Sequence, residues 1–528
     1  MRLLSLLVGL CIPVLLAIDS PAEAACSGSG LVWTCTAGST IGDVQSAVNN
    51  ASDGATVTFS SGSYSWASGS ITLSNSKGVT LICQTVQSCT VSQGSDSVIY
   101  MDTLSGNNTK LYRISGFTFQ NGDGCTCIWF YGSGTLNKLR IDHNRFQNYR
   151  GDAALVLLGE TTTPGKFYAL IDHNTVVNSS SVMLAKILGA ENMNNWPSSL
   201  RGTASNVFLE DNTITITTQT NTGLGCVDVW SAGQMVFRNN TIQNCRIVAH
   251  GVAHGGVANF EVYRNTITQT AGGFSNCYRS IHHQGSGEMF VWGNTLNCSS
   301  SISGGAIEFL HYRSGTPGEA GYSDGSVAPA GQCNGSRVGD GNTSASATHR
   351  GYPCWMQPGR APAGGSPAWG KLSPVAVYRN TYNGTKVDTN FDCPWSGGGY
   401  CAQHIQANRD YYNAVSVSAQ TAPTSPFNGT VGIGHGTLAN RPATCTHVTA
   451  PDGDNGGGVM YWATDQGSWN SSGGGEQGVL YRCSTTNVWT AHYTPYTYPH
   501  PLVNGGGGTG GGGGSLTPPP APINLTVQ

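Results

Sequence analysis

One short pattern recurs along this sequence, and it constrains the fold more than any other feature. Each copy is a run of alternating apolar residues that ends at an asparagine and returns to an apolar residue two positions later. The copies follow one another every ~25–30 residues, a spacing typical of repeat architectures. They lie at residues 139–146, 170–176, 207–214, 235–242, 260–267, 290–296 and 375–382, with a degenerate copy at 112–119. A unit of this size cannot bury its own apolar face, so the copies must stack on one another.

A second apolar run separates successive copies. These runs lie at residues 154–158, 182–188, 226–230, 247–252, 280–283 and 306–311. Each repeat therefore predicts a coil with at least two strands, and matching strands of successive coils should pair in parallel ~4.8 Å apart. We expect an all-β chain that forms a parallel β-helix from about residue 56 to residue 385.

The recurring asparagines are expected to line one corner of the β-helix. They are Asn144, Asn174, Asn212, Asn240, Asn265 and Asn294. Stacked amides can hydrogen-bond along the axis of the coil, and asparagine tolerates the left-handed backbone of a tight turn. An Asn-Asn-Thr triplet also has the form of a glycosylation acceptor, but the ladder accounts for every copy.

The first residues predict export. Arg2 precedes an apolar run at residues 3–18, and a stretch of small residues ending at Ala24 offers a cleavage site. This pattern is typical of a signal peptide at residues 1–24, and no later apolar run is long enough to span a membrane. We expect a secreted protein that is extracellular or held at the cell surface.

Cysteine usage fits an oxidising environment. Removal of Cys11 with the signal peptide leaves 16 of the 17 cysteines, and disulfides are expected. The expected local pairs are Cys26–Cys35, Cys83–Cys89, Cys277–Cys298, Cys333–Cys354, Cys393–Cys401 and Cys445–Cys483. Cys125 and Cys127 are too close in sequence to bridge each other readily, and metal binding is an alternative for them.

Charge is scarce and excludes one class of partner. Charged residues make up 10% of the chain and the net charge is −3, without a basic patch, so nucleic acid is not expected as a partner. An acidic polysaccharide needs only a local cluster of positive charge and stays open.

The N-terminal region carries a family resemblance. Residues 40–51 predict a short amphipathic helix with Thr40 as its N-cap, followed by strands at residues 54–59, 71–73 and 79–82. This order resembles the entry of pectate-lyase-like right-handed parallel β-helix proteins. The resemblance implies that the helix covers the open end of the first coil. It also implies a polysaccharide substrate, with a calcium ion among the cofactors such enzymes use.

Beyond the signal peptide, the chain divides into three parts. Residues 25–390 are assigned to the β-helix, with a Gly- and Pro-rich insertion at 315–370 that either walls a groove or has no role. Residues 391–504 predict a small, disulfide-clamped antiparallel β module, with residues 493–501 packed on the coil as a strap or offering a sugar-stacking platform. Residues 505–528 form a glycine linker and a Pro-rich tail.

Titratable side chains gather at equivalent positions of the second strand. As candidate catalytic residues we assign Asp228, His250, His282, His283 and Glu308; as candidate substrate-binding residues, Lys186, His254, Arg279, His311 and Arg313. Stacked coils would bring these groups within reach of one sugar ring. We assign no metal ligands.

Two classes of function remain open at this point. The first is an enzyme that binds or cleaves an extracellular, acidic polysaccharide, as a lyase or as a hydrolase. The second is a non-catalytic surface, adhesion or structural protein, in which this column of titratable side chains is a solvated polar face. An enzyme should place the column in a walled cleft.

Overall fold

A computed structural model describes residues 25–66, 68–151, 154–160, 165–189, 199–218, 225–250, 256–270, 277–299, 305–310, 335, 340–354, 357–361, 370–392, 404–415, 427–473 and 476–505. The expected signal peptide, most of the 315–370 insertion and the tail from residue 506 lie outside these residues. No helix among the described residues is long and apolar enough to cross a membrane.

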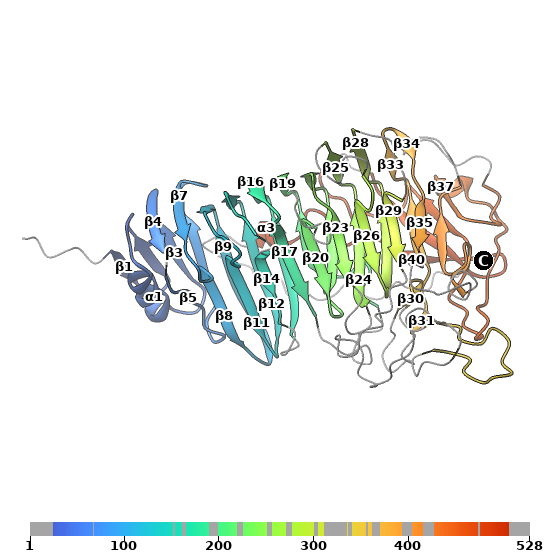
Figure 1. Cartoon of the computed structure of the whole chain (residues 1–528), viewed down its shortest axis with the longest axis horizontal. Coiled ribbons are helices and arrows are strands. Elements are labelled where there is room, and N and C mark those ends of the chain that lie inside the picture. Colours follow the sequence, from blue (N-terminus) through green and yellow to red (C-terminus); the bar gives the residue numbers. More distant parts are fainter. Residues whose placement is uncertain are drawn as a thin grey trace, which may run out of the picture.

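The chain winds into a parallel β-helix built of three sheets, which confirms the expected fold (Figure 1). Each coil passes through sheet 1, an asparagine turn, sheet 2 and then sheet 3. In spatial order, the described strands of sheet 1 are β1 (Cys26–Ser29), β2 (Val32–Cys35), β3 (Ala55–Phe59), β6 (Val79–Cys83), β9 (Asn107–Ser115), β12 (Thr135–Asp142), β15 (Lys166–Asp172), β18 (Val207–Glu210), β21 (Gln234–Arg238), β24 (Gly256–Tyr263), β27 (Ser286–Trp292), β32 (Val375–Tyr378) and β36 (Tyr411–Asn413).

The other two sheets repeat this order. Sheet 2 contains β4 (Gly62–Trp66), β7 (Cys89–Gln93), β10 (Phe117–Gln120), β13 (Arg145–Gln147), β16 (Thr175–Ser180), β19 (Thr213–Thr218), β22 (Thr241–Gln243), β25 (Thr266–Gln269), β28 (Thr295–Cys298), β33 (Thr381–Tyr382) and β34 (Thr385–Lys386). Sheet 3 contains β5 (Ile71–Thr72), β8 (Ile99–Leu104), β11 (Ile128–Gly132), β14 (Ala154–Leu158), β17 (Met183–Leu188), β20 (Val227–Trp230), β23 (Ile247–His250), β26 (Ile281–Gln284), β29 (Ile307–Leu310) and β35 (Thr389–Asp392). Parallel pairing continues to β36, beyond residue 390.

Alternation along each strand builds the core. In sheet 3, Val227, Val229, Ile247 and Ala249 point into the coil and are fully buried, whereas the residue between each pair points outward. Equivalent positions of successive strands are in register, so one apolar column fills the interior from the first coil to the last. This register fixes which side chains line the outer face of each sheet.

The asparagines form the expected ladder at the turn between sheets 1 and 2. From Asn144 to Asn380, each amide nitrogen donates to the amide oxygen of the next asparagine at 2.8–3.1 Å, and each backbone N–H donates to the same oxygen at 2.9–3.1 Å. Each is at most 1% exposed. The left-handed residue is the one before the asparagine, such as His173 (φ 55°) or Asp211 (φ 59°), which corrects the expectation that asparagine itself adopts it.

Helix α1 (Ile41–Asn50) lies at the N-terminal end of the coil, as expected (Figure 1). Thr40 caps it, because its hydroxyl accepts from the backbone of Asp43 while the Asp43 carboxylate accepts from the backbone of Thr40. Val44, Ala47 and Val48 are buried against the first coil. The helix thus covers an apolar end that would otherwise face solvent.

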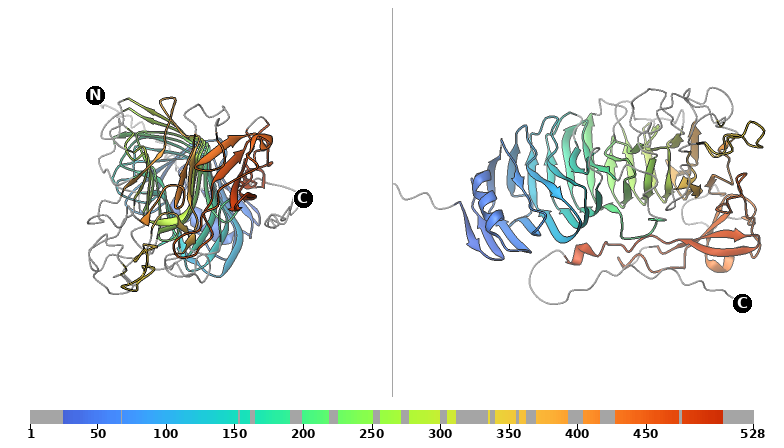
Figure 2. Two further views of the ribbon diagram at one scale, coloured as in Figure 1. Left: turned by 90° about the vertical axis from the view of Figure 1, so that its right-hand side faces the viewer. Right: turned by 90° about the horizontal axis from the view of Figure 1, so that it is seen from below.

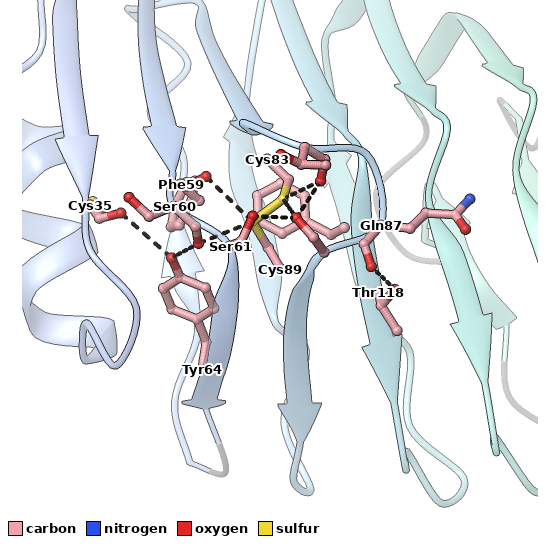
Figure 3. The surroundings of a disulfide bond; sticks show 12 residues. Cys35, Phe59, Ser60, Ser61, Tyr64, Cys83, Gln87, Cys89 and Thr118 are labelled. Atoms are coloured by element: carbon pink, nitrogen blue, oxygen red, sulfur yellow. Dashed lines mark hydrogen bonds between the residues drawn. A yellow bond between two sulfur atoms is a disulfide. The ribbon is translucent and has the colours of Figure 1, made fainter.

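Disulfides among the described residues are local in sequence, as expected. Pairs Cys26–Cys35, Cys83–Cys89, Cys277–Cys298 and Cys445–Cys483 form as predicted, and Cys226–Cys245 is an additional pair. Figure 3 shows Cys83–Cys89 closing the turn from β6 to β7. Cys354 is also disulfide-bonded; its expected partner Cys333 and the expected pair Cys393–Cys401 lie outside the described residues. Cys125 and Cys127 are free.

The C-terminal module is a small sheet of β37 (Ile433–Gly436), β38 (Met460–Ala463), β39 (Val479–Thr485) and β40 (Val488–Tyr493). Its pairing is antiparallel, as expected, except between β37 and β38, which are parallel, and a 3₁₀ turn at Leu438–Asn440 follows β37. The two-stranded β30 (Arg360–Ala361) and β31 (Lys371–Leu372) precede it.

The segment after β40 runs back along the outer face of sheet 1 to the short helix α3 (Leu502–Gly505) (Figure 2). The hydroxyl of Tyr493 donates to the buried carboxylate of Glu261 at 2.6 Å, and the Arg238 guanidinium donates to the carbonyls of Tyr496 and Thr497 at 2.6 and 2.8 Å. Because this strap covers sheet 1, its aromatic residues are packing groups rather than a free platform. The column of titratable side chains assigned from the sequence lies on sheet 3 rather than under this strap.

Candidate functional site

The candidate site lies on the outward face of sheet 3. The register places Lys186 beside Asp228, Asp228 beside Val248, Val248 beside His282 and His282 beside Glu308. A second outward column, two residues further along each strand, places Trp230 beside His250. The sequence-predicted residues Lys186, Asp228, His250, His282 and Glu308 are thus brought onto one face.

Asp228 and His250 form a hydrogen-bonded pair across neighbouring coils. The His250 Nδ1 lies 2.7 Å from the Asp228 Oδ1, and the two side chains are 24% and 5% exposed. Burial opposes protonation of His250, but the Asp228 carboxylate outweighs it, so the pKa of His250 is raised above its ordinary value. Trp230 packs edge-on to His250, and the Lys186 ammonium lies 4.8 Å from the Trp230 ring centre.

His282 has the opposite electrostatic environment. Its side chain is 6% exposed, and burial followed by the positive charges of Arg279 and others holds the pKa of His282 well below its ordinary value. The Glu308 Oε1 lies 3.9 Å from the His282 Nε2 but only 2.5 Å from the Arg279 Nε. His282 is therefore a neutral imidazole at neutral pH, held beside an arginine–glutamate pair.

Arg279 is positioned by the turn that precedes β26. It has a left-handed backbone (φ 56°), and Cys277, two residues earlier, is bonded to Cys298 at the end of β28. The disulfide ties this turn to sheet 2. The Arg279 side chain is 24% exposed, so its guanidinium can still meet a ligand.

Arg246 and Trp230 belong to this face but were not predicted. Arg246 is buried immediately before β23, and burial together with the charge of Arg279 lowers its pKa to about 10. The sequence signal that could have identified Arg246 was its position directly beside an apolar strand in a chain with few charged residues. We name Lys186, Asp228, Trp230, Arg246, His250, Arg279, His282 and Glu308 the sheet 3 cluster.

His283 does not join the cluster, which corrects its assignment as a catalytic residue. It is fully buried and points into the coil, in register with Ala249 and Phe309. Its ring lies among the rings of Phe260 and Phe309, and burial lowers its pKa to about 3. Neighbouring residues of a strand face opposite sides, so His282 and His283 could not both point outward.

Three further assigned residues, His254, His311 and Arg313, lie outside the described residues. The connections flanking sheet 3 at residues 251–255 and 311–334 lie outside them as well, so the walled cleft stays a prediction. Two cavities in the described part of the chain lie away from this face, at the turn around Asp123 and beside Arg264.

The donor groups of the cluster do not suit a calcium ion. Calcium takes six to eight oxygen ligands, whereas the face presents arginines, and its carboxylates Asp228 and Glu308 already contact His250 and Arg279. Among the described residues, no group of three or more His, Cys, Asp or Glu side chains is arranged to hold a metal ion.

Comparison with known proteins adds little to this geometry. No family model and no curated protein matches the sequence. Among solved structures, the chain is similar to the PL6 family polysaccharide lyase Pedsa3628 from Pseudopedobacter saltans, with 12% sequence identity and a TM-score of 0.35 over 75% of this chain and 87% of that chain. The parallel β-helix is established by the strand pairing of the chain itself.

Proposed function

We propose that this protein binds an acidic, uronate-containing polysaccharide on the outward face of sheet 3 and cleaves it by β-elimination. The observation that carries the proposal is that the pKa values of two nearby imidazoles are shifted in opposite directions. The pKa of His282 is lowered, whereas the pKa of His250 is raised. Titratable groups whose environments push their pKa values apart are suited to act as base and acid in one reaction.

The roles follow from charge and position. Arg279, with Arg246 behind it, would bind the uronate carboxylate and make the proton on the adjacent carbon more acidic. Neutral His282 takes that proton, and the electrons left behind form a carbon–carbon double bond. The bond from the next carbon to the glycosidic oxygen breaks, and that oxygen takes a proton from His250, whose protonated form is stabilised by the Asp228 carboxylate.

The spacing of the carboxylates argues against hydrolysis. Asp228 and Glu308 are separated by three strand spacings through Val248 and His282, which amounts to ~14 Å. Glycosidases hold their two carboxyl groups at about 5–5.5 Å or about 6.5–9.5 Å. Both carboxylates also already contact a basic side chain, Asp228 with His250 and Glu308 with Arg279.

A second candidate function is binding without cleavage. The side chain of His282 is only 6% exposed, and access to it is the condition for catalysis. In this alternative the arginines recognise the uronate carboxylates and the surface serves adhesion. The disulfides and the absence of a membrane-spanning helix among the described residues fit an extracellular protein in either case.

The test is a panel of acidic and neutral glycans with two readouts, binding and the ultraviolet absorbance of unsaturated uronate. His282→Gln should lower turnover about a hundredfold or more, the effect of a lost acid–base group, with little change in stability. His250→Gln should also lose activity. His143→Gln is its matched control, because the His143 Nδ1 also contacts an aspartate carboxylate, 2.8 Å from the Asp142 Oδ2, on another face.

The outcomes separate the alternatives. Unsaturated product that depends on His282 and His250 but not on His143 supports the lyase. Binding that depends on Arg279 without any unsaturated product supports the non-catalytic function. Full activity in both His282→Gln and His250→Gln would contradict the proposed catalytic roles.

A further inference from the structure

Three aromatic side chains lie on the same outward face of sheet 3, on the side of the sheet 3 cluster nearer α1. They are Tyr100 on β8 and Trp129 and Tyr131 on β11. Each is half-buried, whereas the intervening Phe130 points into the coil and is fully buried. The three rings lie 4.7–5.6 Å apart, and we name them the aromatic platform.

The platform is held in place by polar contacts at its edges. The Trp129 Nε1 donates to the carbonyl of Gly159 at 3.2 Å, and the hydroxyls of Tyr100 and Tyr131 contact each other. The rings are therefore fixed without being enclosed. Rigid, partly exposed aromatic rings with satisfied polar ends are typical of binding surfaces, because little side-chain entropy is lost when a ligand covers them.

The platform and the cluster belong to one column of the sheet. Tyr100 pairs with Trp129, Trp129 with Leu157, Leu157 with Lys186 and Lys186 with Asp228. Trp129 is thus three strand spacings from Asp228, ~14 Å, and five from His282, ~24 Å. A pyranose ring advances a glycan by about one strand spacing, ~5 Å. A chain laid along the axis would meet the platform about three to five sugars from the cluster.

We infer that the aromatic platform is a remote subsite that stacks on the sugar rings of the same polysaccharide whose carboxylates meet the cluster. This inference rests on the proposed function and adds a requirement for substrate length. The platform carries no cation, so it would bind the apolar face of a ring and leave carboxylate recognition to Arg279. The preferred substrate is then a polymer or long oligosaccharide that spans both patches, not a short fragment.

The experiment compares trisaccharides with octasaccharides of galacturonate and of the uronates of alginate, by binding and by rate. In the wild-type protein the octasaccharide should bind at least tenfold more tightly. Trp129→Ala should remove most of this difference and leave trisaccharide binding unchanged. Trp489→Ala is the matched control, because Trp489 is also half-buried and donates to a backbone carbonyl, at 2.8 Å from Pro442, but lies in the C-terminal module.

The outcomes distinguish the platform inference from the proposed function of the cluster. If binding depends on Arg279 but is equal for both lengths, or if Trp129→Ala keeps the full difference, the platform inference is wrong and the cluster stands. If Trp129→Ala weakens octasaccharide binding while Arg279→Ala does not, the platform stands and the cluster is not the binding site. If neither uronate oligosaccharide binds, both are contradicted.

Discussion

Removing one amide from the middle of the asparagine ladder should destabilise the whole β-helix. The Asn240 side chain takes part in five hydrogen bonds: its oxygen accepts from the backbone and side chain of Asn212, and its nitrogen donates to Leu209, Arg238 and Asn265 at 2.9–3.1 Å. In Asn240→Ala all five are lost. The backbone N–H of Asn212 is then buried without its acceptor.

The size of the effect follows from burial. A buried hydrogen bond contributes about 1 kcal/mol net, and leaving a buried donor unpaired costs about 1–3 kcal/mol. Since the side-chain nitrogen of Asn212 keeps other acceptors, we expect a loss of ~3–5 kcal/mol for Asn240→Ala. The partly exposed Asn137, whose amide donates to Asn107 and Asn108, is the control, and Asn137→Ala should lose less than ~1 kcal/mol.

Urea unfolding followed by circular dichroism measures both variants. The midpoint of Asn240→Ala should fall well below those of the wild type and Asn137→Ala. A solenoid can unfold in parts, so a changed slope would itself indicate that neighbouring coils have been uncoupled. Equal midpoints for the two variants would refute the structural role of the ladder.

Three further changes have expected outcomes. Tyr493→Phe removes the hydroxyl that donates to the buried carboxylate of Glu261 and should cost about 1–3 kcal/mol in unfolding free energy; an unchanged urea midpoint would show that the strap is not docked this way. His283→Phe should leave glycan binding unchanged. Because the pKa of His283 is about 3 in the fold, the unfolded chain binds the extra proton between about pH 6.5 and pH 3, so this variant should lose less stability on acidification than the wild type; equal acid sensitivity would contradict the buried position. Asp228→Asn should lower the pKa of His250, followed by an NMR titration of its ring protons; an unchanged titration would mean that the carboxylate does not set it.

The sequence predicted the coil because each copy of the repeat can be recognised in a short segment, and the regular recurrence of the copies requires them to stack. Every asparagine of the ladder occupies the predicted corner, and Thr40 caps the predicted helix. Where one signal stood alone, the prediction was weaker. In the C-terminal module, β37 and β38 pair in parallel rather than antiparallel. The Cys226–Cys245 bond joins turns of neighbouring coils, and the cysteine spacing alone does not show that these turns lie close together.

The sequence predicted which residues of the candidate site line up on one face, but not the pKa values that decide their chemical roles. Equivalent positions on the second strand of each coil brought Asp228, His282 and Glu308 onto one face. The alternation of the strand should have excluded His283, since Ile281 and His283 share the inner side. The pKa values of His250 and His282 diverge because different charges surround each ring. Arg246 and Arg279 supply some of these charges from turns, and the repeat does not predict where side chains on those turns point.

The most direct test is a structure of the protein with a bound uronate octasaccharide. The account predicts a sugar chain laid along the axis of the coil on the outward face of sheet 3. It should stack on Trp129 at one end and place a carboxylate against the Arg279 guanidinium, with His282 beneath the same sugar. An octasaccharide bound on sheet 2, on the strap or across the C-terminal module, with sheet 3 bare, would contradict the central claim.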